Sequence, residues 1–154
     1  NKRLLDRTRS GDASRVLTMP VRHVGFDALR GRTHMLLVTY RRDGTPVPTP
    51  VWFGQDGDRL YVWTEEHAYK AKRLRRQGRA LVAPSTARGA PTGEPIAALG
   101  RVIDDAAGRE RAAQVIQRSW GPLRRLFERM SRPVTDAVFI ELTPDRPMPV
   151  GSEP

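Results

Sequence analysis

Two Asp-Gly pairs, Asp43-Gly44 and Asp56-Gly57, divide a stretch of β-forming residues into three short segments. The segments are residues 35–40, 45–53 and 60–64, which are rich in Val, Leu, Tyr, Trp and Thr. Asp-Gly tolerates the positive φ angles that tight hairpin turns need. Strands joined by such short turns run antiparallel, so the sequence predicts an antiparallel meander and argues against a parallel α/β sheet.

The rest of the chain alternates between helices, strands and loops. Its pattern predicts a helix over about 68–77, a strand over 80–83, a loop over 84–95, a strand over 96–103, a helix over 104–130 that breaks near 121–122, and a last strand over 137–142. Six short strands with a few helices indicate a mainly β, α+β chain that forms a small barrel with α decoration.

A length of 154 residues fits one domain. Residues 1–20 are polar, basic and weakly periodic, so we expect a mobile basic N-terminal arm. Residues 21–145 hold all the expected strands and form the barrel domain. Residues 146–154 are expected to be a C-terminal tail, because the sequence beyond Thr143 is rich in proline.

Alternating prolines mark the second segment. In an extended strand the backbone N–H groups of residues i, i+2 and i+4 point to the same side, and Pro46, Pro48 and Pro50 lack all three. That side of the strand cannot donate to a neighbour, so we expect an edge strand. Two interpretations remain open: an edge protected against aggregation, or a rigid edge that lines a ligand pocket.

The chain carries a strong positive charge. Lys and Arg number 27 and Asp and Glu number 17, which gives a formal net charge of +10. Such a chain attracts anions, which leaves nucleic acid, a membrane surface, or a phosphorylated or polycarboxylate small molecule as ligand classes.

The densest cationic cluster lies in the expected helix near residue 70, and residues 70–79 contain no acid. The cluster consists of Lys70, Lys72, Arg73, Arg75, Arg76 and Arg79. A solvated helix face is the ordinary explanation for such a run, but cations without intervening acids repel one another. The helix also follows a strand directly, so its N-terminal N–H groups and Lys70 can share one anion.

Several function classes are excluded by what the sequence lacks. Without Cys there is no disulfide scaffold, thiol catalysis or Cys-ligated zinc, and the three widely spaced His residues give no metal-ligand pattern. GxGxxG, Walker A, GxSxG and HExxH motifs are missing, so an enzyme of this sequence would rely on a cofactor. No apolar run approaches the ~18 residues of a membrane span. The N-terminus has no apolar signal region, so we expect a cytoplasmic protein without membrane contact.

Six motifs, in this order, resemble the deazaflavin-dependent reductases of the flavin/deazaflavin oxidoreductase superfamily, which is related to pyridoxamine 5′-phosphate oxidase. They are residues 39–53 (TYRRDGTPVPTPVWF), 60–64 (LYVWT), 70–74 (KAKRL), 83–89 (APSTARG), 120–123 (WGPL) and 140–144 (IELTP). The resemblance covers roughly residues 25–145 and leaves residues 1–20 outside.

The resemblance implies a split β-barrel homodimer that binds its cofactor at the dimer interface. It implies that the dihydro form of coenzyme F420, or FMN in some relatives, supplies a hydride to a conjugated small-molecule substrate. Coenzyme F420 carries a phosphate and a γ-linked oligoglutamate tail and is therefore a polyanion. FMN, the second choice, has one phosphate and no tail, so the dense basic cluster favours the longer anion.

The resemblance also assigns roles to residues. Along the deazaflavin ring it places Pro48, Thr49, Pro50, Val51 and Trp52. Thr64 and Lys70 match the residues that hold the cofactor phosphate, and Lys72, Arg73 and Arg76 are expected to neutralise the remaining anionic groups. Ala87 and Arg88 fall in a loop that helps to close the site. Trp120 stands where relatives have Tyr and is expected to reach the substrate from the partner subunit. Solvent, Tyr69 or His67 could supply the proton.

Two other functions stay open beside the reductase. A basic small barrel could bind nucleic acid by stacking bases on Tyr40, Trp52, Tyr61 and Trp63. Only 6% of the residues are aromatic, core packing accounts for most of them, and no RNA-binding aromatic motif is present, which all count against that function. A protein of the same fold could also carry a deazaflavin or FMN without turnover.

Overall fold

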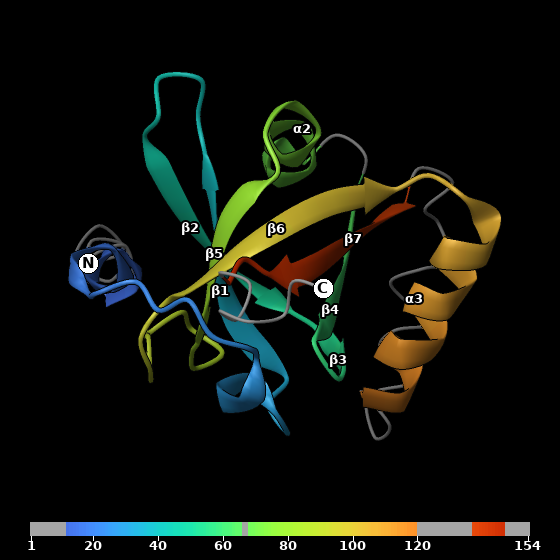
Figure 1. The fold of residues 1–154 in the computed structure, drawn as a ribbon, viewed down its shortest axis with the longest axis horizontal. Coiled ribbons are helices and arrows are strands. Elements are labelled where there is room, and N and C mark those ends of the chain that lie inside the picture. Colours follow the sequence, from blue (N-terminus) through green and yellow to red (C-terminus); the bar gives the residue numbers. More distant parts are fainter. Residues whose placement is uncertain (1–11, 66–67, 120–136, 147–154) are drawn as a thin grey trace, which may run out of the picture.

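The computed structural model describes residues 12–65, 68–119 and 137–146. Its strands are β1 (His34–Tyr40), β2 (Pro46–Trp52), β3 (Gly54–Asp56), β4 (Arg59–Glu65), β5 (Arg79–Pro84), β6 (Ile96–Ile103) and β7 (Ala137–Pro144). Its helices are the 3-10 turns η1 (Arg15–Thr18) and η2 (Asp27–Leu29) and the α-helices α2 (Tyr69–Arg76) and α3 (Ala106–Ser119) (Figure 1). The expected mainly β chain with α decoration is confirmed.

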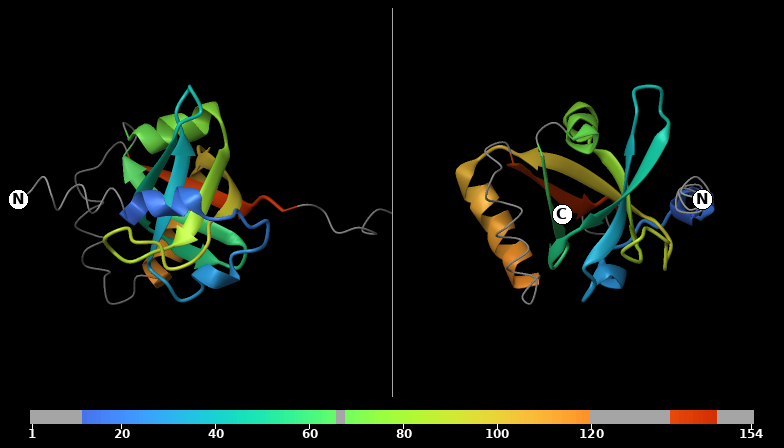
Figure 2. Two further views of the ribbon diagram at one scale, coloured as in Figure 1. Left: turned by 90° about the vertical axis from the view of Figure 1, so that its left-hand side faces the viewer. Right: turned by 180° about the vertical axis from the view of Figure 1, so that it is seen from behind.

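The strands form one sheet in the order β2-β1-β5-β6-β7-β4-β3, and every ladder between these strands is antiparallel. The two outermost strands, β2 and β3, follow each other in the chain with only Phe53 between them. A sheet whose two edges are joined by one residue has to curl on itself. The result is the half-open barrel of Figure 2.

The expected meander is right for its first hairpin and for the turn at Asp56-Gly57, which joins β3 to β4, but the pairing of its third strand with its second is wrong. β1 pairs with β2 over seven residues, but β4 pairs with β3 and β7 and forms no ladder with β2. The chain turns inward at Phe53, which is fully buried. At Gly54 it then runs so close to α3 that an added Cβ would lie 2.9 Å from Cα of Ile116. These long-range contacts place β4 at the far end of the sheet from β2, between β7 and the edge strand β3.

The main core fills the barrel, and α2 covers one of its ends. Ala71 and Leu74, one turn apart on α2, belong to the same apolar cluster as Met35, Leu37 and Val62. A Cβ at Gly100 of β6 would lie 3.1 Å from Leu74, so this glycine lets the helix sit close to the sheet. The buried face of α2 thus fixes the helix, while its cationic residues stay outside.

The N-terminal segment is partly attached to the barrel. Val16 of η1 is fully buried and Ala13 nearly so, and both pack with Leu36 and Val38 of β1 on the outer side of the sheet (Figure 2, left). A mobile arm is therefore wrong for this part of residues 1–20, because its apolar side chains are needed to cover that face. Residues 1–11 lie outside the described residues, as do the expected helix beyond Ser119 and most of the C-terminal tail.

Candidate functional site

β2 is an edge strand, as its prolines predicted. In the register with β1, Pro46, Pro48 and Pro50 lie opposite Tyr40, Val38 and Leu36. Since β2 has a neighbour on one side only among the described strands, the missing N–H groups point away from the ladder, and pairing with β1 is intact. The strand therefore offers an outer edge that donates no hydrogen bond at these three positions.

The residues expected along the cofactor ring differ in accessibility. Pro48, Thr49 and Trp52 are half-buried and Pro50 is exposed. Val51 is only 7% exposed and belongs to the barrel core, so it can meet a ligand through its backbone alone. This difference follows from the alternation of side chains along a strand.

His34 stands beside the far end of β2. Its ring meets Trp52 edge to face, with the ring centroids 4.7 Å apart, and its Nδ1 lies 2.9 Å from Oγ1 of Thr33. Burial lowers the pKa of His34 from its ordinary value of 6.5. The imidazole is therefore neutral at pH 7, and it supports the indole that ends the expected ring-binding strand.

The structure brings the loop after β5 to β2. Thr86 closes a tight turn, since its Oγ1 accepts a 3.1 Å hydrogen bond from the N–H of Ala90. Gly89 has a φ of +93°, and a Cβ added there would lie 3.4 Å from Cγ of Pro50. Ala87 and Arg88 are exposed at the tip of this turn, next to the proline edge. The turn that carries Ala87 and Arg88 thus lies next to β2, the strand on which the cofactor ring is expected.

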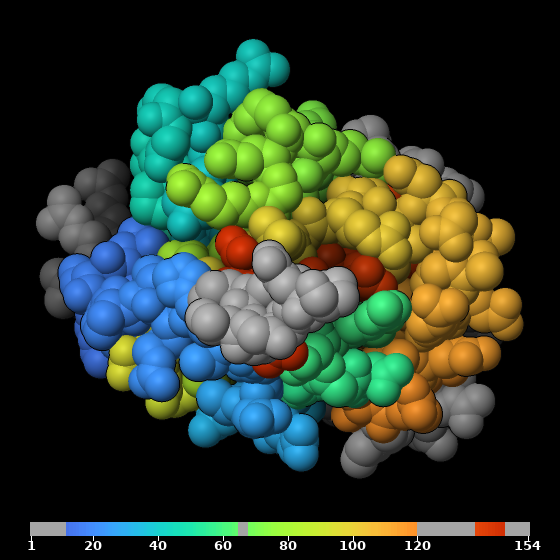
Figure 3. Space-filling view, viewed as in Figure 1, coloured from blue at the N-terminus to red at the C-terminus, as the bar shows by residue number. Residues whose placement is uncertain are grey.

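A cleft of about 660 Å³ lies between α2 and the tip of the β1–β2 hairpin. It is lined by Arg41, Arg42, Tyr69, Lys72, Arg73 and Arg76. Figure 3 shows the hairpin and α2 next to each other at the top of the molecule. Five of these six described residues are cations and none is an acid, so the cleft is suited to an anion with several charges.

Two arginines of α2 are held against β1. Arg76 Nη2 donates a 2.7 Å hydrogen bond to the carbonyl oxygen of Tyr40, and Arg73 Nη1 donates a 3.4 Å hydrogen bond to Oγ1 of the buried Thr39. Burial lowers the pKa of Arg73, and the like charges of Arg41 and Arg76 lower it further. The group stays protonated at neutral pH, and the smaller part of the shift, due to Arg41 and Arg76, reflects a crowding of positive charge that an anion would relieve.

Two further cations of the predicted cluster make structural contacts outside the cleft lining. Arg75 forms an ion pair with Asp104, with Nη1 and Oδ1 3.4 Å apart, and the guanidinium of Arg79 lies 4.4 Å from the centre of the Tyr40 ring. Cations that are neighbours in the sequence therefore separate in the structure: some line the cleft, and others make these two structural contacts. Only Lys72, Arg73 and Arg76 of that run line the cleft.

The expected phosphate-binding pair lies at the same end of the barrel. Thr64 is 5% exposed near the end of β4, and Lys70 is half-buried in the first turn of α2. His67, between them, lies outside the described residues, and so does Trp120, which was expected to contact the substrate. The roles of these two residues stay predictions.

Arg41 and Arg42 were missed by the sequence analysis. They stand directly before the Asp43-Gly44 turn, and a hairpin tip with two adjacent arginines was a visible signal. What the sequence could not show is that the hairpin tip faces α2, because that contact joins segments about 30 residues apart and depends on the closure of the barrel.

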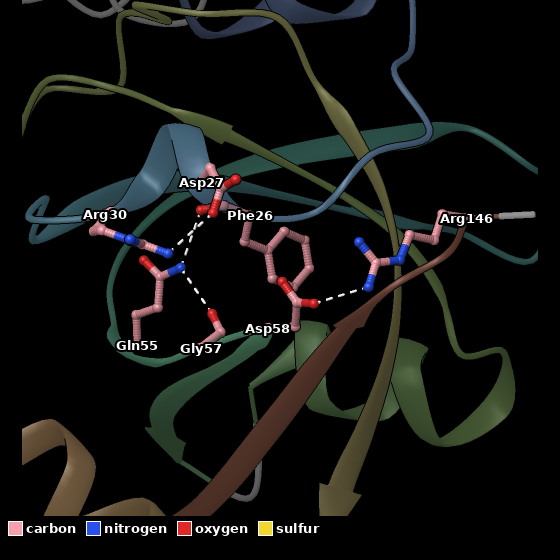
Figure 4. A network of polar contacts seen from close by, with 7 residues as sticks. All are labelled: Phe26, Asp27, Arg30, Gln55, Gly57, Asp58 and Arg146. Atoms are coloured by element: carbon pink, nitrogen blue, oxygen red, sulfur yellow. Dashed lines mark hydrogen bonds and ion pairs between the residues drawn. The ribbon is translucent and has the colours of Figure 1, made fainter. Parts of the chain in front are cut away.

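A second pocket, of about 290 Å³, lies at the other end of β1 and borders on Gln55. Gln55 Nε2 donates hydrogen bonds of 3.0 Å to the carbonyl oxygens of Phe26 and Gly57 (Figure 4). Nearby, Arg146 and Asp58 form a 2.9 Å ion pair. These contacts connect η2, the β3–β4 turn and the end of β7. We therefore interpret the polar residues of this region as structural.

Two properties of the described residues bear on ligand classes. No three of their His, Asp and Glu side chains gather in a group that could hold a metal ion. None of their helices is both long and apolar enough to cross a bilayer.

Sequence comparisons give no family: no family model and no curated protein matches the chain. Comparison of structures does find similar chains. A putative pyridoxamine 5′-phosphate oxidase from Listeria innocua has a TM-score of 0.55 and 17% identity, with 87% of this chain and 94% of that one covered. The heme storage protein HutZ from Vibrio cholerae has a TM-score of 0.59 and 16% identity over 75% and 84%.

A FAD-binding protein from Mesorhizobium loti is similar as well, with a TM-score of 0.53 and 15% identity over 77% of this chain and 85% of that one. At such low identity the likeness concerns the fold, because one fold hosts many functions. The antiparallel half-barrel with its few helices is therefore the split β-barrel that pyridoxamine 5′-phosphate oxidase-like, flavin-binding proteins share.

Proposed function

We propose that the protein is a reductase that uses the dihydro form of coenzyme F420 to transfer a hydride to a conjugated small-molecule substrate. The observation that carries the proposal is the cleft between the hairpin tip and α2, where five cations meet without an acid. It adjoins the start of the proline edge strand, on which the resemblance places the ring. A flat ring on β2 and an anionic end in the cleft would match the two halves of this cofactor.

The dimensions agree with an extended ligand. Pro46, opposite Tyr40, stands at the cleft end of β2, and Trp52 stands six residues further along. At about 3.3 Å per residue the strand covers about 20 Å between them. A ligand that lies along β2 can thus keep its ring near Trp52 while its charged end reaches α2.

The bound cofactor supplies a hydride, and the chain positions it. The edge of β2 aligns the ring, the cations of α2 hold the anionic end, and the turn with Ala87 and Arg88 narrows access to Pro50. Trp120 of the partner subunit completes the substrate side in a cytoplasmic homodimer. For the proton the candidates are solvent water, His67 and Tyr69, which is 72% exposed beside the cleft.

FMN is the competing cofactor, since the similar structures include a FAD-binding protein and a putative oxidase of the flavin-binding fold. The five cations favour coenzyme F420, because a single phosphate cannot pair with all of them. A non-catalytic carrier of either cofactor is the second candidate function, and it is supported by the similar structure that is described as a heme storage protein.

The proposal is tested by a turnover assay with reduced coenzyme F420 and a panel of conjugated acceptors, such as quinones, unsaturated lactones and linear tetrapyrroles. Oxidation restores the absorbance of the deazaflavin, which gives the rate directly. The proposal predicts oxidation with at least one acceptor, at a rate proportional to protein concentration. Tight cofactor binding with no oxidation by any acceptor would favour the carrier instead.

A further inference from the structure

The cleft between α2 and the hairpin holds an aromatic side chain that an oligocarboxylate tail does not need. Tyr69 begins α2, lines the cleft and is 72% exposed. Lys72 Nζ lies 5.8 Å and the Arg73 guanidinium 5.5 Å from the centre of its ring. Both cations lie over the ring, yet the side chain remains largely exposed, so a nucleobase can stack on the part of the ring that they leave accessible while cations pair its phosphates.

The cationic walls of the cleft are held in place. In the hairpin, the N–H of Arg41 donates to the carbonyl oxygen of Thr45 at 2.9 Å, and the N–H of Thr45 donates to Oδ1 of Asp43 at 3.0 Å. Opposite, the hydrogen bond from Arg76 to Tyr40 fixes the last turn of α2. The backbone of both walls is thus held in place, so binding of a chain of phosphates needs rearrangement of side chains alone.

The cleft has more positive charge and more volume than a single phosphate group needs. Among the described residues, none of the five cleft cations has a carboxylate within ion-pair distance. The cleft measures about 660 Å³, and a water molecule occupies about 30 Å³ of liquid. Roughly twenty waters therefore fit, which leaves room for a base, a sugar and two or three phosphates.

We propose that this cleft binds a nucleoside di- or triphosphate, with the base stacked on Tyr69 and the phosphates between Arg41, Arg42 and the cations of α2. The site does not depend on the proposed reductase activity. Because the proposed function places the anionic end of the cofactor in the same cleft, the nucleotide and the cofactor would exclude each other, and the nucleotide concentration would regulate cofactor binding.

The test is calorimetric titration of the full chain with ATP, ADP, adenosine and inorganic tripolyphosphate, without divalent cations. We expect ATP to bind more tightly than ADP, adenosine to bind weakly, and tripolyphosphate to bind more weakly than ATP. The variant Tyr69→Ala should lower the affinity for ATP by about tenfold and leave that for tripolyphosphate unchanged, since it removes only the stacking surface. Tyr69→Phe should restore the affinity for ATP.

Charge is controlled separately. The double variant Arg41→Ala/Arg42→Ala should weaken the binding of both ATP and tripolyphosphate, whereas Arg111→Ala/Arg118→Ala should weaken the binding of neither. This control removes the same net charge as the double variant of the hairpin. It leaves the cleft unchanged, because Arg111 and Arg118 are exposed on α3, on the opposite side of the molecule from the hairpin (Figure 1).

Three results would overturn the proposal. Equal affinities for ATP and tripolyphosphate that Tyr69→Ala leaves equal would mean that the cleft is a general anion site without base recognition. No binding of any phosphate compound would remove the site. A single-stranded oligonucleotide that binds far more tightly than ATP would assign the surface to nucleic acid. None of these measurements uses a deazaflavin, so failure here is distinct from failure of the reductase proposal.

Discussion

Arg76, in the last turn of α2, donates a 2.7 Å hydrogen bond to the main-chain carbonyl oxygen of Tyr40, at the end of β1. This contact joins the helix that carries the cations to the hairpin that carries Arg41 and Arg42. It converts two basic segments, about 30 residues apart in the chain, into opposite walls of one cleft.

The variant Arg76→Ala should weaken binding of coenzyme F420 by about tenfold, because it removes one cation and releases the two walls from each other. Arg76→Lys keeps the charge but cannot reproduce the guanidinium geometry, so its affinity for coenzyme F420 should lie between those of Arg76→Ala and the wild type. Fluorescence titration gives both values. If Arg76→Lys binds as weakly as Arg76→Ala, geometry outweighs charge; if neither changes the affinity, Arg76 takes no part in the site.

The variant Lys70→Glu should weaken cofactor binding by more than about tenfold, because it reverses the charge of a residue expected to hold the phosphate. The fold should stay intact, since Ala71 and Leu74, the buried residues of α2, are unchanged. Arg111→Glu on α3 makes the same change in net charge away from the cleft. Equal affinity of Lys70→Glu and Arg111→Glu would withdraw the phosphate role from Lys70.

Glu141→Gln should lower the free energy of unfolding by about 1–3 kcal/mol. The carboxylate is only 8% exposed and accepts hydrogen bonds from Tyr61 Oη at 3.1 Å and from Arg101 Nε at 3.0 Å, across the three neighbouring strands β4, β7 and β6. Tyr61→Phe removes one of these bonds and should cost about 1 kcal/mol. Urea denaturation measures both, and a loss for Tyr61→Phe as large as that for Glu141→Gln would contradict the central role of the carboxylate.

His34 should make the stability depend on pH. Burial lowers its pKa below 6.5, so the folded state favours the neutral imidazole. That contribution is fully present above pH 6.5 and is lost as the pH falls through the lower pKa of the folded state. Replacing His34 with Gln should therefore flatten the fall in melting temperature on the acid side of pH 6.5. An unchanged pH profile would show that another group causes it.

The prolines of β2 allow the two interpretations of this edge to be separated. Pro48→Val and Pro50→Val each restore an outward N–H group on an edge strand. If the prolines only protect the edge, the variants should self-associate in light scattering while cofactor affinity stays the same. If the edge aligns a ligand, affinity should fall in the monodisperse fraction as well. A lack of effect on both would leave the alternation without a role.

Local chemistry made much of the fold predictable. The strand expected over 96–103 matches β6, and the first hairpin has the expected turn, because Asp43-Gly44 and the β-forming residues around it act over short distances. The edge position of β2 followed from three missing N–H groups alone.

Long-range contacts account for what the sequence did not show. The position of β4 beside β7 depends on the inward turn at Phe53 and the close approach at Gly54, and neither has a local signal for strand order. The sequence showed the cationic cluster but not which partner each side chain contacts. Arg75 pairs with Asp104, whereas Arg73 and Arg76 contact β1, which leads into the hairpin. The cleft exists only once the barrel has closed.

The central claim is that this split barrel holds a deazaflavin, with its anionic end in the cleft beside α2. The most direct test is fluorescence titration of the purified protein with coenzyme F420 and, in parallel, with FMN, at the same moderate salt concentration. The account predicts micromolar or tighter binding of coenzyme F420 and clearly weaker binding of FMN. Tight binding of FMN alone, or no binding of either, would contradict it.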